Sequence, residues 1–173
     1  MNRASIVSYL QTRPRLCVLA TSTSGGKPEC AVLAYAVKED LSLVLSTHKS
    51  SRKCKNIEEN NQVSLVFGWA YNEINIQCDG TAQILEKGEK FLHYENFFFS
   101  VNPHAEKFKG LDTVFISVKP TWVRITDFTQ TPVKIEEEMI DKTQENTKLV
   151  IDVIELPKKK PRASKKSPSP TTE

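Results

Sequence analysis

Apolar residues in this chain gather in short runs, and many runs alternate with polar residues in the two-residue period of a half-buried β-strand. Runs of this type cover residues 16–23, 29–37, 41–47, 62–69, 74–85, 113–118 and 122–127. Turn-forming residues separate several of them, most clearly in the segment SGGKP at 24–28. Gly80, inside one run, predicts a bulge or bend of the kind that barrels need at corners. This pattern predicts a mainly β fold, an antiparallel barrel with small helices inserted.

Three segments have helical spacing instead. Ile6, Val7 and Leu10 form one apolar face within residues 5–12, and this helix should end before Pro14. Residues 51–60 form the second predicted helix and residues 89–99 the third. The third segment carries five large apolar side chains that we interpret as packing residues rather than a cofactor site: Phe91, Leu92, Tyr94, Phe97 and Phe98. Residues 101–110 follow it as a predicted loop.

The chain beyond residue 128 differs in composition. Residues 136–138 are three Glu, which we interpret as a solvated face, and residues 149–156 are apolar but ambiguous between strand and helix. Residues 157–173 contain six Lys or Arg, one Glu and no large apolar side chain, so we expect them to be disordered. We therefore predict a barrel domain at 1–128, a C-terminal extension at 129–156 packed on the barrel or on a partner, and a basic tail at 157–173.

The tail accounts for the basic character of the chain. The net charge is +3, but the tail carries five net positive charges, which leaves the remaining residues near −2. Nucleic-acid binding by the domain is therefore not expected. The tail itself keeps two interpretations, a solubilising end or a salt-sensitive contact with nucleic acid or an acidic partner.

The cysteine pattern and the N-terminus limit the class of protein further. The four cysteines, at positions 17, 30, 54 and 78, form no CxxC pair, and three lie in strand-like runs where a thiol behaves as a small buried apolar group. We expect neither a disulfide framework nor a metal site. The apolar stretch at the N-terminus is too short for a signal peptide, and no apolar run could span a bilayer. These features predict a cytoplasmic protein.

The segment 45–57 (LSTHKSSRKCKNI) carries the clearest candidate chemistry. It passes from a strand through hydroxyl residues into a helix for which Ser51 is a plausible N-cap. The positive end of the helix dipole, Arg52 and Lys53, and the nearby hydroxyl groups together favour a phosphate. The alternative is an ordinary capped helix with solvated basic residues, and the segment alone does not decide between the two.

In this order of elements, residues 16–128 resemble the FMN-binding split β-barrel family of pyridoxamine 5′-phosphate oxidase. LATSTSGGKPECAVLAYAV is similar to the first hairpin of the family, and LSTHKSSRKCKNIEENNQVSLVF to its phosphate segment with the following helix and strand. INIQCDGTAQIL resembles the strand with the pattern V-x-G-x-A, and FISVKPTWVRITDF the closing strands. The resemblance covers about two-thirds of the chain and implies an antiparallel split barrel that binds FMN.

The resemblance also implies roles for individual residues. Ser46 and Thr47 would contact the phosphate side of the flavin, and Arg52 and Lys53, preceded by Ser51, would hold its phosphate. The backbone of one strand would run along the isoalloxazine ring; its residues are Ala31, Val32, Leu33, Ala34 and Tyr35. Asn75 stands where the oxidases carry a Gln that reaches the flavin. Trp122 and Arg124 match the aromatic residue and the Arg of the closing strand. In the family a partner subunit completes each site, so a homodimer with FMN at the interface is implied.

Two departures from the family pattern bear on function. Ala31 stands where the oxidases supply an Arg toward the phosphate, and the loss of one cation should lower FMN affinity unless His48 or Lys49 replaces it. The C-terminal Arg-x-His segment that holds the vitamin substrate has no counterpart here. We therefore do not expect a true pyridoxamine 5′-phosphate oxidase.

The resemblance leads to an FMN-binding flavoprotein that acts as an oxidoreductase on an unknown small substrate. The alternative is a non-catalytic flavin- or haem-binding protein with a stress or interaction role on the same fold. For haem, His48, His93 and His104 are candidate axial ligands, although no spacing supports them over ordinary surface histidines.

Overall fold

The computed structural model describes residues 1–85, 87–140 and 148–150. Its elements, in chain order, are α1 (Arg3–Thr12), β1 (Leu16–Ser22), β2 (Pro28–Val37), β3 (Leu43–His48), α2 (Arg52–Glu59), β4 (Gln62–Phe67), β5 (Ile74–Leu85), α3 (Glu89–Val101), the 3₁₀ helix η1 (Pro103–Phe108), β6 (Thr113–Asp127), β7 (Lys134–Met139) and β8 (Lys148–Val150). No helix in these described ranges is both long enough and apolar enough to cross a membrane.

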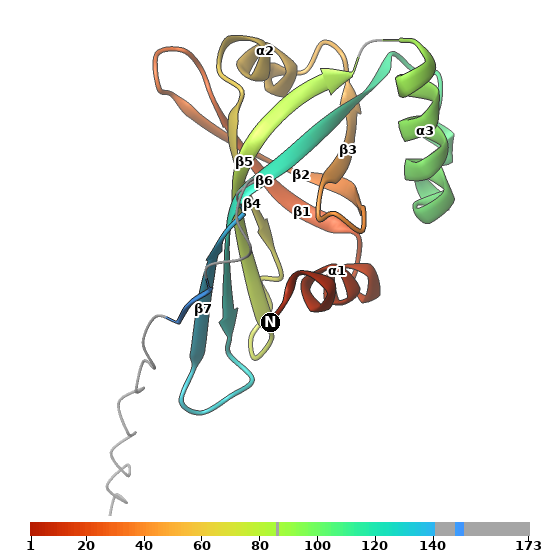
Figure 1. Cartoon of the computed structure of the whole chain (residues 1–173). Helices are drawn as coiled ribbons and strands as arrows, with labels where there is room; N and C mark the ends of the chain where they lie inside the picture. The colour runs from red at the N-terminus through yellow and green to blue at the C-terminus, as the bar shows by residue number, and fades with distance from the viewer. Residues whose placement is uncertain (86, 141–147, 151–173) are drawn as a thin grey trace, which may run out of the picture.

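The strands form an antiparallel barrel with a two-stranded extension (Figure 1). Six of them follow the order β3-β2-β1-β4-β5-β6, and pairing between β3 and β6 closes the barrel. β7 and β8 continue the sheet beyond β6. The predicted antiparallel barrel with small helices is therefore confirmed.

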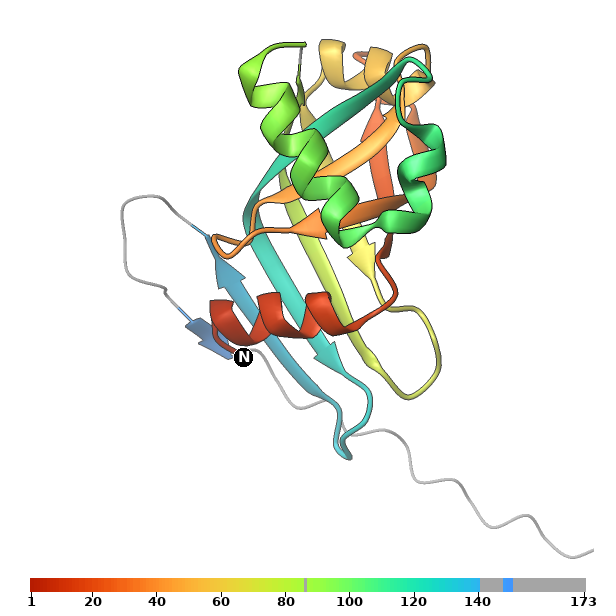
Figure 2. The same cartoon turned by 90° about the vertical axis from the view of Figure 1, so that its right-hand side faces the viewer.

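Two apolar clusters fill the molecule. The larger one lies inside the barrel, where the Tyr35 and Phe67 rings pack edge to face with centroids 4.9 Å apart. α1 lies across one end of the barrel (Figure 2) and adds Ile6, Val7 and Leu10 to this cluster. The second cluster lies between the outer side of the barrel and α3, where the rings of Phe91 and Phe98 surround Phe115. The apolar side chains of the strands therefore pack into two cores, one inside the barrel and one on its outer side beneath α3.

The bulge predicted at Gly80 is present in the pairing of β5 with β6. The register shifts between Asp79 and Gly80, so that Gly80 faces Pro120 while Asp79 faces Trp122, and Thr121 is the extra residue. A Cβ atom on Gly80 would lie 2.4 Å from the carbonyl oxygen of Lys119. The close approach of two backbones thus requires glycine at this position.

Some predictions for the later elements were wrong. Residues 113–118 and 122–127 belong to one strand, because the bulge accommodates Pro120 instead of ending the strand. Residues 101–110 contain the helix η1 rather than an open loop. Glu136 and Glu138 are not solvated: they lie in β7 with 5% and 8% of their surface exposed. Glu136 accepts hydrogen bonds from the N-terminal ammonium group and from Lys134.

Other predictions were correct for some residues and wrong for others. Cys17, Cys54 and Cys78 are buried, but Cys30 is exposed, and all four thiols are free. On α3, Phe91 and Phe98 are buried whereas Leu92 is exposed. Of the segment 149–156, residues 149 and 150 lie in β8. The rest of that segment and the basic tail lie outside the described residues.

Candidate functional site

The barrel wall is split between β2 and β3. These strands pair only from Tyr35 to Val37 on β2, whereas the end of β3, Ser46 to His48, pairs with β6 instead. We call the unpaired edge of β2 (residues 28–34) and the facing end of β3 (residues 46–48) the seam. The seam leaves a strand edge with backbone groups that no strand in the described ranges takes up.

Backbone geometry decides which groups of β2 face the seam. The Tyr35 amide donates to the Arg15 carbonyl at 3.1 Å, on the β1 side. Because the N–H and C=O groups of successive residues point to opposite sides of a strand, those of Val32 and Ala34 point toward the seam. A flat ligand that follows this edge would find alternating donors and acceptors there.

The N-terminus of α2 adjoins the β3 side of the seam. Ser51 occupies the N-cap position, as predicted, but its side chain makes no capping hydrogen bond. Instead its hydroxyl group lies 3.4 Å from the Thr47 hydroxyl and 3.4 Å from the Cys54 sulfur. Cys54 N is the first amide to donate to the Ser51 carbonyl, at 3.0 Å. The amides of Arg52 and Lys53 therefore precede the intrahelical hydrogen bonds, as expected of an anion-binding helix end.

Arg52 has a partner that the sequence did not indicate. Its Nη1 atom lies 2.9 Å from Oε1 of Glu29 on β2, although 77% of the Arg52 side chain is exposed against 12% for Glu29. The buried Asn56 donates to Glu29 Oε2 at 3.1 Å and to the Thr21 hydroxyl at 3.0 Å. Arg52 thus stands at the end of a polar chain that begins inside the protein.

The same side of α2 is fastened to the β1–β2 turn further along. The backbone amide and the hydroxyl group of Ser24 donate to Glu59 at 3.2 and 2.9 Å, and these bonds lower the pKa of the Glu59 carboxyl. Asn60 donates to the Ser22 hydroxyl at 2.8 Å. These contacts fix the helix, and with it the position of Arg52 and Lys53, relative to β2.

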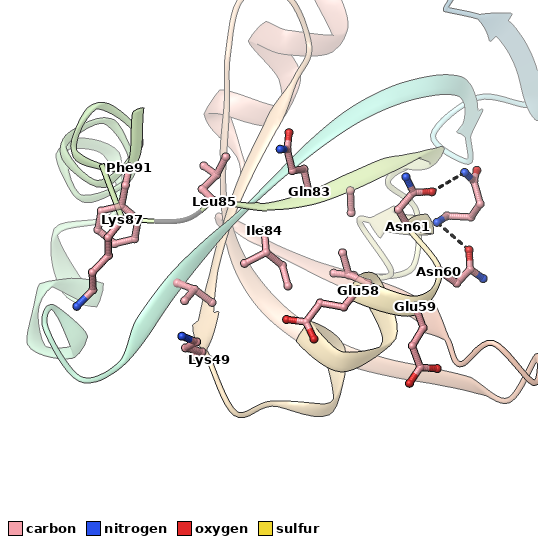
Figure 3. A pocket seen from close by; sticks show the side chains of 14 residues that line it. Lys49, Glu58, Glu59, Asn60, Asn61, Gln83, Ile84, Leu85, Lys87 and Phe91 are labelled. Carbon is pink, nitrogen blue, oxygen red and sulfur yellow. Dashed lines mark hydrogen bonds between the residues drawn. The ribbon is translucent and has the colours of Figure 1, made fainter. Parts of the chain in front are cut away.

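Of the two residues offered as replacements for the missing Arg, His48 lies at the end of β3 in the seam, whereas Lys49 lies outside it. Lys49 lines a pocket of about 1060 Å³ between the C-terminal end of α2, β4, β5 and α3, and it shares this pocket with Lys87 and Glu58 (Figure 3). The residues predicted to hold the phosphate do not line it. His48 is exposed, and its Nδ1 atom lies 2.9 Å from the Ser50 hydroxyl. Lys49 therefore lines a pocket that is separate from the seam.

Three of the predicted site residues are distant from this end of the barrel. Asn75 faces Thr126 and donates its amide to the Gly68 carbonyl. Trp122 lies eight positions beyond Val114, the β6 residue that pairs with Thr47. At a rise of roughly 3.3 Å per residue, this distance is about 25 Å. Within a single chain, Trp122 and Arg124 therefore do not meet the α2 end of the seam.

Trp122 and Arg124 instead share the outer face of the sheet with the exposed side chains of β2. Cross-strand pairing places one row of residues side by side on this face: Val32, Val18, Val66, Gln77, Arg124 and Glu137. Arg124 Nη1 lies 3.4 Å from Oε1 of Glu137. Val32 is 57% exposed, and Leu16 and Met139 on the same face are also exposed. The outer face thus combines exposed apolar side chains with the two closing-strand residues.

Two of the thiols, Cys17 and Cys78, are buried in the barrel core, away from the seam. Burial raises the pKa of Cys17 and of Cys78 to about 12, and the neighbouring thiol of Cys78 adds to the shift at Cys17. Across the described ranges, no group of three His, Cys, Asp or Glu side chains is arranged to hold a metal ion.

The chain is similar in sequence to known proteins. A family model described as pyridoxamine 5′-phosphate oxidase matches residues 5–127. The pyridoxine/pyridoxamine 5′-phosphate oxidase of Rubrobacter xylanophilus is 33% identical over 94 residues, which cover 54% of this chain and 41% of that protein. The chain spans about two-fifths of the length of the curated relatives it matches.

Solved structures share the fold at low sequence identity. A pyridoxamine 5′-phosphate oxidase-related, FMN-binding protein from Nostoc punctiforme superposes with a TM-score of 0.67 at 12% identity, covering 86% of this chain and 94% of that chain. A heme-binding protein from Mycobacterium smegmatis superposes with a TM-score of 0.62 at 15% identity, covering 78% of this chain and 57% of that chain.

Proposed function

The chain belongs to the pyridoxamine 5′-phosphate oxidase family, and we propose on this basis that it binds FMN along the seam between β2 and β3. The observation that carries the proposal is the unpaired edge of β2, which ends beside the N-terminus of α2. The family match spans both elements.

The residues at the seam fit this ligand in two respects. Arg52, Lys53 and the first amides of α2 offer charge-assisted hydrogen bonds to a phosphate, each worth roughly 1.5–3 kcal/mol. The backbone groups of Val32 and Ala34 offer donors and acceptors to the polar edge of a flat ring. The small or apolar side chains of this strand leave its backbone accessible to such a ring.

We further propose that the protein is a flavin-dependent oxidoreductase for an unknown small substrate. Bound FMN would supply the hydride or electron transfer, and the chain would bind and orient the flavin and exclude water from it. Neither Val32 nor Ala34 carries a titratable side chain, so proton transfer at the ring would depend on the backbone, on the substrate or on a partner.

We also propose a homodimer, and the distribution of the predicted site residues supports it. In their own chain, Trp122 lies about 25 Å and Arg124 about 33 Å along β6 from the α2 end of the seam, so a second copy would have to bring its own pair to each flavin. The exposed apolar side chains beside them, Val32 and Met139, support an interface on this face of the sheet. The cytoplasmic location remains a prediction.

A non-catalytic flavin- or haem-binding protein is the second candidate. The lack of a titratable side chain on Val32 and Ala34, whose backbone groups point toward the seam, supports this candidate. Steady-state oxidation of NADH or NADPH by the FMN-loaded protein would separate the two functions. Absorption spectra after haem titration would test the haem version, since an axial ligand gives a distinct Soret band.

The direct test of FMN binding is the absorption spectrum of the purified protein, followed by titration with FMN while flavin fluorescence is recorded. We expect flavin absorption bands or quenching of the added FMN. A colourless protein that leaves FMN fluorescence unchanged would refute the proposal.

A further inference from the structure

Glu29 is held in place from inside the protein. Both oxygens of its carboxylate have partners, Arg52 on one side and Asn56 on the other. Asn56 and Thr21, which continue this chain of hydrogen bonds, are buried, and the Glu29 side chain is only 12% exposed. The carboxylate therefore cannot turn away when an anion approaches Arg52.

Arg52 is the exposed member of the pair. Most of its side chain is exposed, and its Nη1 atom is the group that contacts Glu29. A guanidinium group has five N–H donors, so Arg52 can offer others to a phosphate while Nη1 stays on Glu29. Glu29 consequently does not block the hydrogen bonds of Arg52, but it reduces the positive charge that Arg52 presents.

The net positive charge at the predicted phosphate site is therefore small. Arg52 and Lys53 contribute two positive charges, Glu29 removes one, and Ala31 supplies none where the family resemblance implies an Arg. A charge within about 8 Å is only partly screened at physiological salt. FMN phosphate, with nearly two negative charges, meets less compensation here than the Arg-Lys pair alone would give.

We propose that Glu29 is a specificity-determining residue that lowers the affinity of the site for the flavin phosphate, and so narrows its preference for FMN over a flavin without a phosphate. The proposal rests on the proposed function, FMN binding at the seam. In this proposal Glu29 opposes phosphate binding, so removal of its charge strengthens binding. If Glu29 only oriented Arg52, removal of its charge would release Arg52 and weaken binding.

The test is Glu29→Gln, titrated with FMN and with riboflavin, which lacks the phosphate. Gln keeps the size of the side chain and an acceptor for Asn56. We expect FMN to bind at least about fivefold more tightly, as roughly 1 kcal/mol of relieved repulsion gives, while riboflavin affinity stays unchanged. The ratio of the two affinities is measured on one sample, so a fraction of unfolded protein does not affect it.

Glu59→Gln is the matched control. It removes the same charge from the same junction between α2 and the β1–β2 hairpin, but at the opposite end of the helix from Arg52. We expect its ratio of FMN to riboflavin affinity to change by less than about twofold, because distance and salt screen the interaction.

The other outcomes separate the two proposals. If the wild-type protein binds FMN and Glu29→Gln binds it equally or more weakly, the role of Glu29 is overturned and FMN binding stands. If neither protein binds FMN or riboflavin, the proposed function fails and the inference fails with it. An equal gain in Glu59→Gln would also overturn the inference, because it would show a general effect of net charge.

Discussion

Asn56 on α2 and Thr21 on β1 are joined by a buried hydrogen bond of 3.0 Å, across the junction that fixes the helix to the barrel. The same Asn56 amide donates to Glu29 at 3.1 Å. The position of the predicted phosphate-binding residues therefore depends on a buried side chain that does not itself face the seam.

Asn56→Ala should destabilise the protein. The change leaves the Thr21 hydroxyl without its donor, deprives the buried part of Glu29 of one partner and opens a small cavity, with an expected cost of about 2–4 kcal/mol in the free energy of unfolding. Urea denaturation measures this cost. Asn61→Ala, on an exposed neighbouring residue, should change it by no more than about 0.5 kcal/mol. Equal effects of both variants would contradict a structural role for the buried network.

Gly80→Ala should also destabilise the protein, for a steric reason. The new methyl group would lie 2.4 Å from the Lys119 carbonyl oxygen, so the two backbones must move apart at the bulge. Overpacking of this kind costs about 1–3 kcal/mol. Gly25→Ala is the control, because the nearest atom to its Cβ would be 3.8 Å away. A lower thermal midpoint for Gly80→Ala alone is the expected result.

The strands were predictable from sequence because their apolar and polar positions alternate, and residues 74–85 were placed with both ends correct. The interruption at 119–121 was misread because Lys-Pro-Thr has the composition of a turn. A proline is tolerated inside β6 since Pro120 faces Gly80 at a bulge, and this relationship joins residues 40 positions apart. Glu136 and Glu138 of β7 were misjudged because burial depends on packing that composition does not reveal.

The candidate site was only partly predictable. Ser51, Arg52 and Lys53 follow one another in sequence, so a local pattern could identify them. Glu29 could not be found in that way, because its contact with Arg52 links β2 to α2 across 23 positions. The distance of Trp122 and Arg124 from the α2 end of the seam could not be predicted locally either, because it depends on strand length and register.

Stability should fall steeply in alkaline solution. The thiols of Cys17 and Cys78 have an ordinary pKa of 9.0, and burial raises the pKa of each to about 12; burial likewise raises the pKa of Tyr35 from 10.0 to about 12. Between pH 9 and 12 the folded state therefore binds more protons than the unfolded state, so the free energy of unfolding decreases as the pH rises. Each group contributes up to about 1.4 kcal/mol per pH unit.

Urea denaturation between pH 8 and 10.5 tests this dependence. Cys17→Ala should show a shallower decline than the wild type, whatever its own stability at pH 8. Cys30→Ala, which removes an exposed thiol, should leave the slope unchanged. A decline of the same steepness in all three proteins would show that the buried thiols do not cause it.

The double variant Arg52→Ala, Lys53→Ala should bind FMN at least about tenfold more weakly, because two charge-assisted hydrogen bonds are lost. Flavin fluorescence titration measures the change. Lys55→Ala, Lys90→Ala is the control, since it removes two exposed cations from α2 and α3. The same loss in riboflavin affinity as in FMN affinity would contradict a phosphate contact.

Val32→Glu should disrupt the homodimer and thereby weaken FMN binding. Val32 is 57% exposed in the single chain, and it lies in the same cross-strand row as Arg124 on the apolar outer face. A carboxylate buried there without a partner opposes association. Leu92→Glu makes the same change at a residue of α3 with the same exposure, 57%, and should leave the dimer intact. Analytical ultracentrifugation of the three proteins at one concentration gives the comparison. A wild-type monomer would refute the homodimer, and a Val32→Glu dimer as stable as the wild type would place the interface elsewhere. Either result would leave Trp122 and Arg124 without a role at the flavin.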